Sequence, residues 1–160
     1  MNWQKICEDP ALRNLPYKIE TNRYGQIIMT PHRLAHSFYQ SEIEQLLRKL
    51  LPQGVVLPEC AIETRDGVKT ADVAWMSRER YAQVKDDFAA TVAPEICVEV
   101  ISPSNTLSEI EDKITLYFAA GAQEVWICRD GAMSFYSAGE ITRETNSELA
   151  PPFPTRVELP

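Results

Sequence analysis

Pro94-Glu95-Ile96-Cys97-Val98-Glu99-Val100-Ile101-Ser102-Pro103 is a short apolar run with a proline at each end. Its length and composition are typical of a β-strand that is buried on both faces of a sheet. Residues 106–109, Thr-Leu-Ser-Glu, fit a helix capping box, and the apolar stripe that follows ends at Gly121. Residues 124–128 are again apolar and predict the next strand. This strand–helix–strand order predicts an α/β core.

The sequence before this run predicts a hairpin, a helix and two further strands. The hairpin pairs residues 17–20 with 26–29 around a turn at Gly25, and the helix follows Pro31. The helix has apolar residues spaced three and four apart, and Pro52 and Gly54 stop it. Strands are predicted at 55–63 and 69–76, separated by a tight turn at Arg65-Asp66-Gly67.

The sequence after residue 128 predicts a hairpin and a tail. Arg129-Asp130-Gly131 connects the strand at 124–128 to another at 132–137, and one more strand is expected up to residue 143. Residues 145–160 have four prolines in the last ten positions and predict a loose tail. We therefore expect one domain over residues 1–160, with its core at about 17–144. The fold class is α/β, a mixed central β-sheet flanked by helices, with an N-terminal hairpin.

Composition restricts the possible functions. The 160 residues include 16 Lys and Arg against 23 Asp and Glu, a net charge of −7. This balance argues against binding nucleic acid through bulk charge, although it permits a local basic groove or a metal-bridged contact. No apolar run approaches the roughly 18–20 residues of a membrane span. Four widely separated cysteines without a C-x-x-C pair indicate a reduced, cytoplasmic protein without a zinc knuckle.

Two acidic residues interrupt apolar strands. Glu99 lies within the buried run, where an unpaired carboxylate would cost several kcal/mol. The alternative is that it lies near the strand end and reaches water or a structural arginine. Asp72 lies among small and apolar residues of the strand at 69–76, although Asp is disfavoured in strands. If these strands are neighbours, the two carboxylates converge, and Mg²⁺ or Mn²⁺ would relieve their repulsion.

Lys113 is the third candidate. It lies on the helix after the Glu99 strand and beside the buried stripe, so its ammonium group could point back toward the strand end. The alternative is a solvated lysine paired with Glu109 one turn earlier. Two acids and a lysine suggest metal-assisted attack of water on a phosphodiester, with the metal on Asp72 and Glu99 and with Lys113 beside the water.

These residues carry a resemblance that covers about residues 17–137. The chain resembles the Uma-two family of bacterial proteins, within the restriction-endonuclease-like PD-(D/E)XK nuclease superfamily. The matching segments are the early TPHRLAH, TADVA at 70–74, APEICVEVISPS at 93–104, Lys113 with Tyr117, and AAGAQEVW at 119–126.

The resemblance implies a restriction-endonuclease-like fold, metal ligands at Asp72 and Glu99, and a lysine that has moved from the strand to the next helix, at Lys113. Position 101 is Ile where the superfamily has the lysine of Glu-x-Lys, and position 71 is Ala where the family usually has Pro. The first departure bears on activity more than on the fold.

Auxiliary residues are predicted around this set. The resemblance assigns His36 to a supporting or phosphate-contacting position, and Glu63, ahead of Glu42, is a further acid that could complete the metal shell. His32 and His36 are four residues apart, but without an H-E-x-x-H pattern they predict a solvent or carbonyl contact ahead of zinc.

The predicted function is a Mg²⁺- or Mn²⁺-dependent phosphodiester hydrolase, a DNA endonuclease, with nucleic acid as partner and a homodimer as a plausible assembly. One alternative is a catalytically inactive nuclease-fold protein that binds nucleic acid or protein. A second is a purely structural partner in a larger assembly, in which Asp72, Glu99 and Lys113 would be scattered through the fold.

Overall fold

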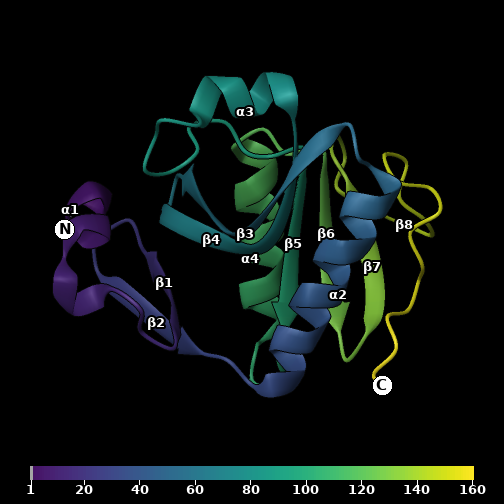
Figure 1. Ribbon diagram of the computed structural model, residues 1–160, viewed down its shortest axis with the longest axis horizontal. Helices are drawn as coiled ribbons and strands as arrows, with labels where there is room; N and C mark the ends of the chain where they lie inside the picture. Colours follow the sequence, from purple (N-terminus) through teal and green to yellow (C-terminus); the bar gives the residue numbers. More distant parts are fainter. Residues whose placement is uncertain (1) are drawn as a thin grey trace.

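The computed structural model describes residues 2–160 and shows a mixed sheet between helices (Figure 1). The helices are α1 (Trp3–Glu8), α2 (Leu34–Leu50), α3 (Arg78–Val84) and α4 (Leu107–Ala119), with a 3₁₀ turn η1 (Pro10–Leu12). The strands are β1 (Tyr17–Thr21), β2 (Ile27–Pro31), β3 (Gly54–Thr64), β4 (Gly67–Ser77), β5 (Ile96–Ile101), β6 (Glu124–Arg129), β7 (Ala132–Ser137) and β8 (Thr142–Glu144).

Six strands form one sheet in the order β3-β4-β5-β6-β7-β8. All neighbours are antiparallel except β5 and β6, which are parallel because α4 connects them. The strands β1 and β2 form a separate antiparallel hairpin. The prediction of a mixed sheet with flanking helices and an N-terminal hairpin is therefore confirmed.

The sheet buries apolar side chains on both faces. On one face, α2 contributes Tyr39, Ile43 and Leu47 to a cluster with the Val98 side of β5. On the other, α4 contributes Ile110, Ile114 and Tyr117 to a second cluster with the Cys97 side. Figure 1 shows α2 and α4 on opposite sides of the strands. The predicted burial of β5 on both faces follows from this arrangement.

Helix α4 begins where the capping-box pattern predicts. The Thr106 side chain accepts a hydrogen bond from the Glu109 N–H, and the Glu109 side chain accepts one from the Thr106 N–H. Two otherwise unpaired N–H groups are satisfied in this way. Because Glu109 is committed to the cap, it is not the main partner of Lys113. This start fixes which turn of α4 faces the end of β5.

The final residues form an ordered part of the core, so the expectation of a loose tail at 145–160 is wrong. Phe153 and Val157 are 2% and 4% exposed, and Phe153 packs against Trp126 with ring centroids 4.5 Å apart. The Val157 N–H donates to the Gly131 carbonyl at 2.7 Å. Gly131 has φ +86°, and a Cβ there would lie 2.2 Å from the Val157 carbonyl oxygen. Prolines prevent regular structure here, but they do not prevent packing.

None of the helices within residues 2–160 combines the length and the apolar character that crossing a bilayer requires.

Candidate functional site

Asp72 and Glu99 meet where β4 and β5 separate. The last paired residues of these strands are Val73 and Val98, so Asp72 and Glu99 are the next pair in the same register. Beyond this point the Asp72 carboxylate replaces the backbone ladder, since its Oδ2 accepts the Val100 N–H at 2.7 Å. Both acids are buried, with Asp72 0% and Glu99 5% exposed. The two carboxylates are thus held at the end of the strand pairing, inside the protein.

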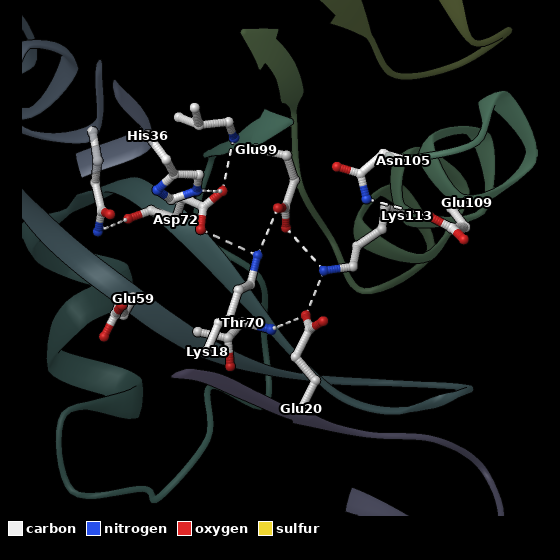
Figure 2. A network of polar contacts seen from close by, with 12 residues as sticks. Lys18, Glu20, His36, Glu59, Thr70, Asp72, Glu99, Asn105, Glu109 and Lys113 are labelled. Carbon is white, nitrogen blue, oxygen red and sulfur yellow. Dashed lines mark hydrogen bonds and ion pairs between the residues drawn. The ribbon is translucent and has the colours of Figure 1, made fainter. Parts of the chain in front are cut away.

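Two lysines neutralise these acids. Lys18 Nζ lies 2.7 Å from Glu99 Oε2 and 3.2 Å from Asp72 Oδ1, so one ammonium group bridges both carboxylates. Lys113 Nζ lies 3.2 Å from Glu99 Oε1 and also contacts Glu20. Figure 2 shows Lys18 and Lys113 approaching Glu99 from two directions. The structure therefore brings Asp72, Glu99 and Lys113 together, as the sequence predicts.

Lys18 and Glu20 were not among the sequence-predicted site residues. They lie two apart on β1, so both side chains leave the same face of the hairpin, and both are 7% exposed. The hairpin is fixed against β4, where Glu20 Oε2 accepts the Thr70 N–H at 2.7 Å. The sequence contains one signal for these two residues. They are charged residues at alternate positions of a strand whose other residues are uncharged.

Glu63 does not join the site. It is exposed on β3, pairs with Val68 near the β3–β4 turn, and lies outside the cavity lining. Glu42 also lies outside this lining. The additional acid of the cluster is Glu20 instead, because the hairpin, not β3, covers the open end of the β4–β5 ladder.

His36 contacts Asp72 from the α2 side. Its Nε2 lies 3.3 Å from Asp72 Oδ2, and the Gln40 side chain donates to the Asp72 carbonyl oxygen at 2.9 Å. The His32 and His36 rings are 4.2 Å apart, and His32 Nε2 lies 3.7 Å from Glu59 Oε1. Burial, reinforced by His36, lowers the pKa of His32. Asp72 is therefore contacted by α2 as well as by the hairpin.

The environments of the two carboxylates differ. Burial opposes ionisation of Asp72, but Lys18, His36 and the Val100 N–H outweigh it and lower the pKa of this carboxyl. For Glu99, burial raises the pKa, and the charges of Asp72 and Glu20 add to this effect although both lysines oppose it. Burial also disfavours a charged Lys18, yet the three carboxylates around it raise its pKa. Asp72 and Lys18 are thus charged at neutral pH.

Tyr117 contacts the Glu99 carboxylate from α4. This fully buried residue of α4 donates its hydroxyl to Glu99 Oε1. Burial, together with the neighbouring Glu99, raises the pKa of the Tyr117 hydroxyl well above its ordinary value, so it remains a donor. The hydroxyl and Lys113 both bind Oε1, which leaves Oε2 directed at Lys18. The orientation of the Glu99 carboxylate is therefore fixed.

A cavity of about 760 Å³ opens onto this cluster. Its lining includes seven acidic residues and four lysines or arginines, besides both histidines. A polyanion entering it would be repelled unless cations were bound there. Asp72 Oδ1 and Glu99 Oε2 already face one cation, Lys18, and Asp72 Oδ1 has no hydrogen-bond partner among the described residues. Their hard oxygen donors suit Mg²⁺ or Mn²⁺.

The fold and the cluster define an α/β protein with a buried carboxylate–lysine site at the open end of its central strand pair. The chain belongs to the Uma2 (Uma-two) family, described as "Putative restriction endonuclease", whose family model matches residues 5–157. The predicted family resemblance is thus confirmed. No curated protein matches the chain significantly.

A solved structure shares the fold. It is the crystal structure of a protein from Anabaena variabilis ATCC 29413, described as a "putative nuclease belonging to DUF820". The TM-score is 0.70 at 18% identity, over 92% of this chain and 87% of that one. At this identity the similarity establishes the fold.

Proposed function

We propose that this protein is a metal-dependent phosphodiester hydrolase, a DNA endonuclease of the PD-(D/E)XK type, that uses Mg²⁺ or Mn²⁺. The observation that carries the proposal is the convergence of Asp72 Oδ1 and Glu99 Oε2 on one cation position beside the cavity. Membership of a family described as "Putative restriction endonuclease" supports the same reaction class.

Asp72 and Glu99 would hold the metal. A bound Mg²⁺ lowers the pKa of water and polarises a phosphoryl oxygen. The position between the two acids is taken by the Lys18 ammonium, so metal binding requires Lys18 to move away from Asp72 and Glu99. The donor set fits the ion, and Lys18 is its internal competitor.

The surrounding side chains have separate roles in this mechanism. Lys113, 20% exposed at its side chain, is positioned to orient the attacking water or to donate to a phosphate oxygen as negative charge develops. Glu20 holds Lys113 from the opposite side. Tyr117 and His36 orient the carboxylates of Glu99 and Asp72 through the contacts described above.

The alternative is a nuclease-fold protein that binds nucleic acid or protein without cutting it. Two observations favour it: Ile101 stands where the superfamily has its strand lysine, and the Lys18 ammonium contacts both acids. In a binding module, Lys18 would remain paired with Asp72 and Glu99, and no metal would replace it.

Cleavage of supercoiled plasmid DNA in Mg²⁺ or Mn²⁺, beside calorimetric titration of the same ions, separates the two functions. The hydrolase requires both cleavage and metal binding, and both must be lost in Asp72→Asn. Intact plasmid and no heat of metal binding would reject the enzyme and favour the module.

A further inference from the structure

His32, His36 and Asp72 form a second group of potential metal ligands, on the α2 side of the site. One ligand atom from each lies within 4.8 Å of the other two. The two imidazole rings face each other at the beginning of α2, with centroids 4.2 Å apart. This group shares only Asp72 with the proposed Mg²⁺ position.

Three buried polar atoms in this group lack hydrogen-bond partners among residues 2–160. They are His32 Nε2, His36 Nδ1 and Asp72 Oδ1. Buried polar atoms are almost always hydrogen-bonded, because desolvating them without a partner is costly. Within the described part of the chain, these three atoms are the complete set of buried side-chain atoms without partners, and all belong to one cluster. Asp72 Oδ1 faces Lys18 at 3.2 Å, on the other side of the carboxylate, so the two unpartnered imidazole nitrogens are the atoms that indicate a missing ligand here.

The distances suit a transition metal ion. His36 Nε2 and Asp72 Oδ2 are 3.3 Å apart, about the separation of two ligands on one tetrahedral ion with bonds of about 2.0–2.1 Å. The remaining separations are up to 4.8 Å, so metal binding would draw these ligand atoms closer together. Imidazole nitrogen with one carboxylate is a donor set for Zn²⁺ or Co²⁺ and not for Mg²⁺.

Glu59 offers a fourth ligand. In the register of β3 and β4 it stands opposite Asp72, at the one position where the pairing is interrupted. Its backbone has φ +48°, an unusual conformation for a residue other than glycine, and such conformations concentrate at functional sites. Its carboxylate is 53% exposed and lies 3.7 Å from His32 Nε2, so it is free to turn toward a bound ion.

We propose that His32, His36 and Asp72 bind one divalent transition metal ion of the Zn²⁺ or Co²⁺ type, with Glu59 completing its shell. The two oxygens of Asp72 face different partners, Oδ1 toward Lys18 and Oδ2 toward His36. Figure 2 shows these partners on different sides of the carboxylate. The inference goes beyond the proposed function, since this site requires neither Glu99 nor Mg²⁺.

The test uses the full chain after chelator treatment, with Co²⁺ as a spectroscopic probe and Zn²⁺ as a diamagnetic one. The chain has only two histidines, so their imidazole NMR signals are unambiguous. We expect one equivalent of Co²⁺ to give visible absorption, Zn²⁺ to shift both imidazole signals, and Mg²⁺ to shift neither. Unshifted histidine signals with saturating Zn²⁺ would overturn the proposal.

Variants locate the ion. His32→Ala should weaken Co²⁺ binding about tenfold or more, since even indirect supporting contacts are worth this much. Ser37→Ala, an exposed change on the same helix, should leave it unchanged. Glu99→Gln should retain the Co²⁺ spectrum. Equal Co²⁺ affinity in His32→Ala and the unmodified protein would overturn the proposal, and circular dichroism confirms that each variant is folded.

The outcomes remain separable from those of the proposed hydrolase. Plasmid cleavage in Mg²⁺ without any histidine shift supports the hydrolase and rejects the histidine site. Histidine shifts and a Co²⁺ spectrum without cleavage in any metal support the histidine site and reject the hydrolase.

Discussion

Asp72 and Glu99 occupy opposite positions on β4 and β5, immediately beyond Val73 and Val98, where the hydrogen-bonded pairing of the strands ends. Two buried carboxylates at adjacent strand positions repel each other unless a cation lies between them. In this protein that cation is the Lys18 ammonium, which contacts both. The Lys18 ammonium of the hairpin therefore supplies the positive charge that a bound metal would otherwise supply. The first two predictions rest on this relationship between Lys18 and the metal.

Removing either carboxylate charge should abolish cleavage. Asp72→Asn and Glu99→Gln keep the side-chain shapes but remove a metal ligand, so we expect plasmid cleavage in Mg²⁺ to fall by about 100-fold or more. Glu124→Gln is the matched control. Glu124 is another buried acid of the sheet, but its carboxylate binds neutral donors, Trp126 Nε1 at 2.9 Å and Ser147 Oγ at 2.6 Å. Its variant should lose stability and retain cleavage. Equal loss in all three variants would assign the effect to folding.

Replacing Lys18 should make stability dependent on metal. In Lys18→Met, Asp72 and Glu99 lose their shared cation, and we expect the metal-free protein to lose about 3–5 kcal/mol of unfolding free energy. Mn²⁺ should then raise Tm more in the variant than in the unmodified protein, because no ammonium group competes for the position. Thermal unfolding with and without Mn²⁺ measures this.

Lys49→Met, an exposed change on α2, is the control for Lys18→Met. It should alter neither stability nor the response to Mn²⁺. If Mn²⁺ raised Tm equally in Lys18→Met and in the unmodified protein, Lys18 would not compete with the metal.

Local sequence patterns predict most of the fold because each element carries its own signal. The capping box of α4, the apolar run of β5 and the glycine turns involve neighbouring residues, and the structure has these elements near the expected bounds. Asp72 and Glu99 were also detectable, because an acid within an apolar strand is costly to bury without a partner. The convergence of their side chains required only that β4 and β5 be neighbours.

The missed site residues depend on contacts between distant segments. Lys18 is 81 residues from Glu99, and nothing in the sequence near Lys18 indicates which strand the hairpin covers. The sequence favours Glu63 on the expectation that a neighbouring strand completes the site, whereas the hairpin occupies that place and brings Glu20. Tertiary position therefore decided which acid joined the cluster.

Lys113 should contribute to cleavage through its charge and its hydrogen bonds. Lys113→Met removes both, and we expect a loss of about 100-fold or more in turnover. Lys113→Arg keeps the charge but changes its geometry, so it should retain part of the activity. Single-turnover cleavage with saturating DNA and Mn²⁺ measures the chemical step. A Lys113→Met protein with unchanged single-turnover rate would remove Lys113 from the mechanism.

Glu20 should contribute pH-dependent stability. Burial opposes its ionisation, but Lys113 and Lys18 outweigh burial and lower its pKa in the folded protein. A lowered pKa adds stability that is complete above the unfolded value of about 4.3 and is lost as the pH falls through the folded value. Glu20→Gln, which keeps an acceptor for the Thr70 N–H, should cost about 2–3 kcal/mol at pH 7 and progressively less below pH 4. Urea unfolding between pH 3 and 7 measures the difference, and a deficit that grows on acidification would contradict the assignment.

The C-terminal segment should be required for stability despite its prolines. Phe153 fills a space against Trp126 and Phe135, with ring centroids 4.5 and 6.3 Å away, and is 2% exposed. Phe153→Ala leaves a cavity in the cluster that supports α2, and we expect it to cost about 3–5 kcal/mol of unfolding free energy. Leu159→Ala, six residues later and 52% exposed, should cost under about 0.5 kcal/mol. Urea denaturation of both variants provides the measurement. Because α2 carries His36, Phe153→Ala should also weaken Co²⁺ binding. Equal stability of Phe153→Ala and Leu159→Ala would instead show that residues 145–160 are a loose tail.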